Sequence, residues 1–150
     1  MIPGDSADGP MLLDDAGTAE LLRSSRTLAV VGASSNPTRP SHGVFRTLLA
    51  SGYRCVPVNP GESEVLGVAA VATLAEAAEA LGGHIDIVDV FRRAEFTADV
   101  AREAVAVGAR ALWLQLGIVN WEAASIAAAG GLVVVMDRCT AIELRRLPRG

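Results

Sequence analysis

The chain has no lysine, so arginine supplies all 13 of its basic side chains. Acidic side chains number 17, which gives a formal net charge of -4 at pH 7. Non-specific affinity for nucleic acid comes from basic side chains that neutralise phosphates. The charge balance therefore predicts that nucleic acid is not a partner.

Long apolar runs and paired cysteines are also missing. No apolar run reaches the roughly 20 residues that a membrane-spanning helix needs. The first 15 residues, MIPGDSADGPMLLDD, lack the basic start and apolar core of a signal peptide. Cys55 and Cys139, the two cysteines, are too few for a disulfide framework. These absences predict a cytoplasmic protein with reduced thiols and no membrane partner.

What the sequence does contain is an alternation of short apolar runs with stretches of helical spacing. The runs expected to be strands are 27–31, 53–58, 85–91, 111–116 and 132–136. The expected helices are 18–25, 41–51, 74–81, 94–107, 121–129 and 140–147. Such alternation is typical of an α/β protein whose parallel sheet is covered by helices on both faces. We expect one domain, 15–150, after a flexible tail of residues 1–14.

The turn at 30–41, VVGASSNPTRPS, joins the first expected strand to a helix. Gly32 ends the strand, and small polar residues follow. A turn of this kind can hold phosphate, because a helix N-terminus offers unpaired N–H groups and small residues allow close approach.

Polar and turn residues also gather where the other expected strands end. They are Asn59-Pro60-Gly61, Arg92-Arg93, Gln115-Leu116-Gly117 and Asp137-Arg138-Cys139. The carboxyl ends of parallel strands share one sheet edge, which is where open α/β sheets bind ligands. Because alternate residues of a strand point opposite ways, we expect only one of Arg92 and Arg93 to face that crevice.

Familiar nucleotide motifs are absent from this edge. The turn has no G-x-G-x-x-G spacing, and the second strand ends at Val58-Asn59-Pro60 without the acid that holds an NAD ribose. No Gly-Lys-Ser/Thr of a Walker A loop occurs. The residues indicate a phosphate-rich ligand held by a helix N-terminus and by Arg39, Arg92 and Arg93. An NADP-type nucleotide remains an alternative.

Five segments in order resemble the small bacterial CoA-binding proteins, which share a domain with the alpha subunit of succinyl-CoA synthetase. They are VVGASSNPTRPS, GYRCVPVNPG, IDIVDVFRR, ALWLQLGIVN and VVMDRC. The resemblance covers about 19–147. It implies a Rossmann-like three-layer α/β fold with a five-stranded parallel sheet, and coenzyme A along the carboxyl edge.

The resemblance also implies contacts along the ligand. Those at the pyrophosphate would be Gly32, Ala33, Ser34 and Arg39, and those at the adenosine Val58, Asn59 and Pro60. Phe91, Arg92 and Arg93 would flank the ligand, and Gln115, Leu116 and Gly117 would approach the pantetheine arm. In succinyl-CoA synthetase and related synthetases, a second domain supplies the phosphorylated histidine used in catalysis. We find no counterpart of that domain in these 150 residues.

No group of residues indicates catalysis or a metal site. Asp86 and Asp89 lie three apart on a strand and so face opposite sides. We therefore predict a non-catalytic module that binds CoA or acyl-CoA. The alternative is an enzyme acting on CoA thioesters through Cys139 or His42. Cys139 could also form a mixed disulfide with CoA, or be a buried structural thiol.

Overall fold

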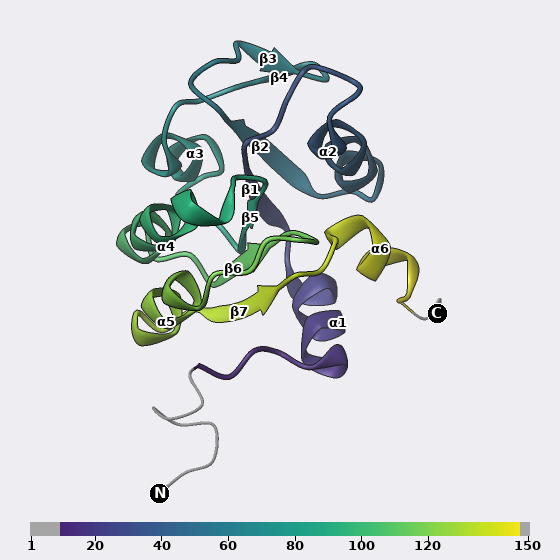
Figure 1. Cartoon of the computed structure of the whole chain (residues 1–150). Helices are drawn as coiled ribbons and strands as arrows, with labels where there is room; N and C mark the ends of the chain where they lie inside the picture. Colours follow the sequence, from purple (N-terminus) through teal and green to yellow (C-terminus); the bar gives the residue numbers. More distant parts are fainter. Residues whose placement is uncertain (1–9, 148–150) are drawn as a thin grey trace, which may run out of the picture.

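The structure, a computed structural model, describes residues 10–147 and is built on one parallel sheet (Figure 1). Its strand order is β2-β1-β5-β6-β7. The strands are β1 Thr27–Val31, β2 Arg54–Val58, β5 Ile87–Val90, β6 Ala111–Leu114 and β7 Val133–Met136. The predicted five-stranded parallel sheet is confirmed, although β2, β6 and β7 are shorter than predicted at one end and β5 is shorter at both.

Helices cover both faces of the sheet, as predicted (Figure 1). One face carries α1 Asp15–Ser24, α2 Pro40–Ala50 and α6 Thr140–Arg145. The other carries α3 Leu74–Ala80, α4 Thr97–Ala106 and α5 Trp121–Ala129. The predicted helix 94–107 begins as a separate 3-10 turn, η1 Ala94–Phe96. No helix within residues 10–147 is long and apolar enough to cross a membrane.

The strand side chains form two cores because they alternate between the faces. Leu28 and Val30 of β1 pack with α1 and α2, in a cluster that includes Phe45 and Trp113. Ala29 of β1 belongs to the cluster that includes α3, α4 and α5. Both clusters are apolar, as expected for a sheet covered on both sides.

The β2 edge of the sheet is partly covered by the segment that follows it. This segment contains a short antiparallel hairpin, β3 Glu64–Val65 and β4 Val68–Ala69. Beyond it, the Val71 N–H donates to the Pro57 carbonyl at 2.9 Å. Proline does not interrupt β2, because its register with β1 continues through Pro57 to Val58. An edge position tolerates proline because only one side of the strand needs ladder bonds.

The β7 edge is contacted by the end of the predicted tail. Residues 1–9 of that tail lie outside the described part of the chain. The Leu13 N–H donates to the Val134 carbonyl at 2.9 Å. Leu12 and Leu13 pack against different cores. The segment just before α1 therefore contacts the edge strand and both faces.

The strand order reverses between β1 and β5, which places a crevice beyond their carboxyl ends. Gly32 follows β1 there with a positive φ of 88°. A Cβ on Gly32 would lie 2.6 Å from the Phe91 carbonyl oxygen. Glycine is therefore required for the two strand exits to lie so close together.

We expect Gly32→Ala to lower the free energy of unfolding by about 2–4 kcal/mol, from left-handed strain plus the backbone clash. Gly52→Ala is the matched control, since its φ is 94° but nothing lies within 4 Å of the added Cβ. It should cost about 1–2 kcal/mol. Urea denaturation at constant m-value measures both, and equal losses would contradict the role assigned to the clash.

Candidate functional site

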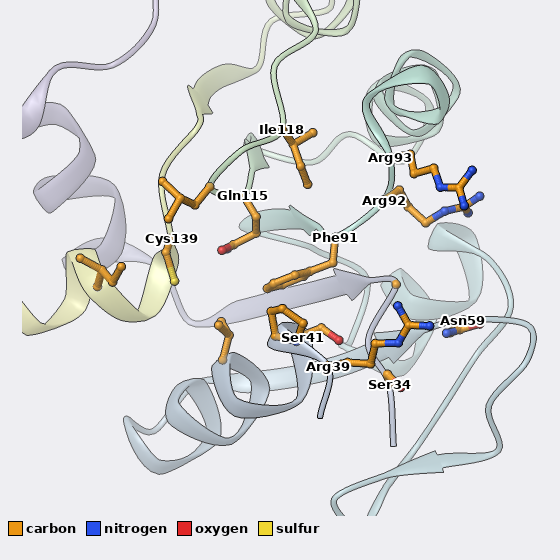
Figure 2. A pocket seen from close by; sticks show the side chains of 15 residues that line it. Ser34, Arg39, Ser41, Asn59, Phe91, Arg92, Arg93, Gln115, Ile118 and Cys139 are labelled. Atoms are coloured by element: carbon orange, nitrogen blue, oxygen red, sulfur yellow. The ribbon is translucent and has the colours of Figure 1, made fainter. Parts of the chain in front are cut away.

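A cavity of about 630 Å³ opens at the carboxyl edge, above the exits of β1 and β5 (Figure 2). Polar side chains and Gly32 gather toward one end, and apolar side chains with a thiol toward the other. Its lining residues are Gly32, Ser34, Arg39, Pro40, Ser41, Val44, Asn59, Phe91, Arg92, Arg93, Gln115, Leu116, Ile118, Cys139 and Ile142. The crevice predicted from the strand ends is therefore present.

Most of the residues predicted to bind the ligand line this cavity. They are Gly32, Ser34, Arg39, Asn59, Phe91, Arg92, Arg93, Gln115 and Leu116. They come from the ends of β1, β2, β5 and β6 and from the turn before α2. Segments far apart in the sequence thus meet because all main-sheet strands run parallel.

Ala33, Val58, Pro60 and Gly117 were also predicted to bind the ligand but do not line the cavity. Ala33 and Val58 are core side chains, 0% and 5% exposed. Pro60 lies on an exposed turn. The Gly117 N–H is used internally, donating to Asp137 Oδ1 at 2.6 Å. Their positions support the neighbouring loops.

The turn after β1 is held in place by side chains from the turn after β2. Asn59 Nδ2 donates to the Ala33 carbonyl at 2.9 Å. The Ser35 N–H donates to Glu62 Oε2 at 2.9 Å. Hydrogen bonds from Ser35 lower the pKa of Glu62. A carboxylate thus already accepts from one amide of the predicted phosphate turn.

His42 holds the same turn from the helix side. Its side chain is 6% exposed, and Nδ1 lies 2.9 Å from the Ser34 carbonyl oxygen. A carbonyl only accepts, so Nδ1 carries the hydrogen and Nε2 accepts from Arg46 Nη2 at 3.3 Å. Both ring nitrogens are therefore engaged in positioning the turn and the helix.

The N-terminus of α2 faces the cavity without a compensating negative charge. Arg39 is the N-cap residue and makes no side-chain capping bond, Pro40 opens the helix, and the first turn has no acidic residue. Ser41 in that turn is 3% exposed and still lines the cavity. Pro40 has no N–H and the His42 N–H donates to the Arg39 carbonyl. The positive end of the helix dipole is therefore what makes this terminus suited to an anion.

Three exposed arginines surround this end of the cavity. Arg39, Arg92 and Arg93 form no ion pair with any residue between 10 and 147. The expectation that only one of Arg92 and Arg93 faces the crevice is wrong, because both line it. β5 ends at Val90, so strand alternation no longer applies. Arg92 also lies over the Phe96 ring, 4.9 Å from its centroid.

A buried polar network lies at the other end. Gln115 Nε2 donates to Asp89 Oδ1 at 2.6 Å and to Thr140 Oγ1 at 3.0 Å. Thr140 Oγ1 in turn donates to Asp89 Oδ2 at 3.1 Å. Burial raises the pKa of Asp89 to about 7, against the effect of these two donors. The sequence indicated correctly that Asp89 and Asp86 are not a pair, since Asp86 accepts from His84 and the Arg26 N–H instead.

Cys139 lies at the start of α6 and is partly exposed in the cavity. The preceding loop is fixed by Trp113 Nε1, which donates to the Arg138 carbonyl at 2.7 Å. The Arg138 guanidinium pairs with Asp15 at 2.7 Å and Glu143 at 3.3 Å. It is therefore committed to two carboxylates rather than to the neighbouring thiol.

Sequence reasoning missed several of the apolar and helix-start residues of the cavity. They are Pro40, Ser41, Val44, Ile118 and Ile142. Ser41 and Val44 lie one helical turn apart after the phosphate turn, which could have indicated them. The residues around Ile142 give no sign that it lines the cavity, because its position depends on how α6 packs over the sheet. No group of three or more possible metal-ligating side chains occurs within the described chain.

Comparison with known proteins places these residues in context. The model of the CoA binding domain family matches residues 26–145. The uncharacterized protein YneT of Bacillus subtilis is 44% identical over 120 residues, covering 80% of this chain and 86% of YneT. The family match includes all five strands of the main sheet.

Solved structures share the fold. A hypothetical protein from Pyrococcus horikoshii has a TM-score of 0.84 at 34% identity, covering 90% of this chain and 92% of that one. A dinucleotide-forming acetyl-coenzyme A synthetase of Ca. Korarchaeum cryptofilum has a TM-score of 0.67 at 19% identity. This chain covers only 27% of that synthetase, so the likeness concerns the fold of one part.

We expect the raised pKa of Asp89 to give a pH-dependent stability. Between about pH 4 and 7 the folded chain keeps a proton that the unfolded chain has lost. Stability should therefore fall as pH rises through this window, by at most about 1.4 kcal/mol per pH unit, and level off above it. The measurement is denaturant unfolding of the wild type, Asp89→Asn and Asp99→Asn.

Asp89→Asn should remove this contribution, so its stability relative to wild type should rise between pH 5 and 8. Asp99→Asn is the control, because Asp99 is an exposed carboxylate on α4. A constant difference between Asp89→Asn and wild type across this range would contradict the prediction.

Proposed function

The chain belongs to the CoA binding domain family, and from this premise we propose that its cavity binds coenzyme A or an acyl-CoA. The observation that carries the proposal is the division of one cavity into a cationic end and an apolar end. CoA has the same division, since a phosphate-rich nucleotide is joined to an uncharged pantetheine arm with a terminal thiol. We further propose that the protein is cytoplasmic and that the domain extends over 15–150.

The diphosphate fits the cationic end. Gly32 and Ser34 offer close backbone approach, α2 offers its N-terminus, and Arg39 offers a planar guanidinium without an ion-pair partner among residues 10–147. Asn59 would lie toward the adenosine, as the resemblance implies. Arg92 and Arg93 provide further positive charge for the phosphates.

The pantetheine arm fits the apolar end. Phe91, Leu116, Ile118 and Ile142 line it. Leu116 is 63% exposed and Ile142 36%, so a ligand here would cover apolar surface that now faces solvent. Removing such surface from water favours the complex.

We propose binding without chemistry. His42 has both ring nitrogens engaged with Ser34 and Arg46. It is therefore a positioning residue for the turn rather than a free acid or base. Within the described chain no side chain hydrogen-bonds the Cys139 thiol, so the nucleophile–base pair of a thiol enzyme is missing. An enzyme acting on CoA thioesters is the alternative, and turnover lost in Cys139→Ala would establish it.

The first test is calorimetric titration with CoA, acetyl-CoA, NADP, NAD and ATP. We expect CoA or acetyl-CoA to bind most tightly, because only they fill both ends of the cavity. Tighter binding of NADP would instead establish the nucleotide alternative. Comparison of CoA with acetyl-CoA reports whether the cavity prefers the free thiol or the acyl group.

Arg39→Ala should raise the Kd for CoA about tenfold, because one charge-assisted contact to phosphate is lost. Pantetheine has no phosphate, so its affinity should not change. Arg54→Ala is the control, since Arg54 begins β2 at the opposite edge of the sheet. An equal loss of CoA affinity in both variants, or an equal loss for pantetheine, would contradict phosphate contact by Arg39.

Glu62→Gln should have the opposite effect. Glu62 now accepts from the Ser35 N–H beside the proposed diphosphate site, and glutamine keeps an oxygen for that bond while removing the charge. We expect a several-fold lower Kd for CoA at low ionic strength, with the gain fading as salt is added. Titrations at two salt concentrations measure this, and unchanged affinity at both would contradict it.

A further inference from the structure

We propose that Cys139 is a modification site that forms a mixed disulfide with coenzyme A bound in the cavity. The inference rests on the proposed function, since the ligand has to be CoA. It adds a covalent state to a site proposed above to bind without chemistry. The protein would then hold CoA covalently under oxidising conditions and release it when reduced.

The first observation is the place of the thiol. Cys139 lies in the same continuous cavity as Gly32 and Arg39, but at its far end (Figure 2). CoA bound with its diphosphate at the cationic end directs its pantetheine arm, and so its sulfur, toward that far end. The apolar wall formed by Phe91, Ile118 and Ile142 lies along this path.

The second, independent observation is an unpartnered acceptor beside the thiol. The Gln115 side chain is 3% exposed. Its Nε2 is used by Asp89 and Thr140, whereas its Oε1 accepts no hydrogen bond from residues 10–147. Figure 2 shows this oxygen turned into the space between Phe91 and Cys139. This oxygen is open to the cavity, so a ligand with an N–H donor can pair with it there, and the pantetheine arm carries amides.

The position of the thiol is also fixed. Trp113 holds the carbonyl of Arg138 on one side of Cys139, and Asp89 holds the hydroxyl of Thr140 on the other. Within the described chain, no side chain hydrogen-bonds the Cys139 sulfur. The thiol is thus held at the cavity wall but free to react.

The other cysteine provides an internal contrast. Cys55 is 4% exposed in the core between the sheet and its helices. Burial raises the pKa of the Cys55 thiol to about 12, which keeps it protonated and unreactive. Only Cys139 therefore combines exposure with a place in the cavity.

The reaction is a thiol–disulfide exchange with CoA disulfide as the oxidant. The Cys139 thiol loses its proton, and the thiolate attacks one sulfur of CoA disulfide. The sulfur–sulfur bond of CoA disulfide breaks as the Cys139–CoA disulfide forms. The departing CoA thiolate takes up the proton, so one free CoA is released for each adduct.

The experiment incubates the full chain with CoA disulfide, pantetheine disulfide or glutathione disulfide at equal concentrations. Intact-mass and peptide-mass measurements follow adduct formation over time. We expect one CoA per chain, on Cys139, formed at least about tenfold faster than the glutathione adduct, because binding places the disulfide beside the thiol. S-methyl-CoA, which binds without a free thiol, should slow the CoA adduct, and dithiothreitol should release it.

Variants locate the effect. Cys139→Ser should abolish the adduct, and Cys55→Ala should retain it. Arg39→Ala should slow the reaction with CoA disulfide without changing that with glutathione disulfide, which distinguishes a directed reaction from general thiol exposure.

The outcomes separate the two proposals. If calorimetry shows CoA binding but Cys139 reacts no faster with CoA disulfide than with glutathione disulfide, the mixed disulfide is wrong and the proposed function stands. If CoA does not bind in calorimetry, the proposed function fails and this inference fails with it.

Discussion

The close approach of two backbones at the centre of the sheet is the constraint on which the site depends. Gly32 lies against the Phe91 carbonyl where β1 and β5 end, at a distance that leaves no room for a Cβ. This contact lets both strands run side by side to their exits and starts the turn toward α2. The backbone N–H groups of the turn between β1 and α2, and the Arg39 side chain, then lie beside the crevice. A bulkier residue at this one position would move the turn relative to every other wall of the cavity.

The polarity of the cavity depends on which charged side chains beside the sheet already have a hydrogen-bond or ion-pair partner. The buried strand side chains are mostly apolar on both faces, and Asp89 in β5 is a buried carboxyl among them. Gln115 and Thr140 satisfy that carboxyl, so the far end of the cavity presents an amide oxygen and apolar walls instead of a charge. At the near end, Arg39, Arg92 and Arg93 have no carboxylate partner among residues 10–147. A ligand with one charged end and one neutral end matches this division.

Much of this architecture could be predicted from the sequence, because it depends on local patterns. The β1 strand, Gly32 at its end and the α5 helix are encoded by neighbouring residues, and they lie where predicted. What could not be predicted depends on tertiary packing. Val58 belongs to a strand exit, yet its side chain points into the core rather than the cavity. Gln115 was placed at the cavity correctly, but its fixed amide orientation requires Asp89 and Thr140 from distant parts of the chain.

The contacts at the outer strands β2 and β7 affect whether another polypeptide can pair with the edges of the sheet. Unpaired strand edges are templates on which another polypeptide can add, and a parallel sheet leaves two of them. Here Pro57 has no N–H to offer and its carbonyl is taken by Val71, while Leu13 occupies the Val134 carbonyl at the opposite border. Strand addition by a second copy would first have to displace these segments. The two outer strands are thus partly covered against edge-to-edge pairing with another chain.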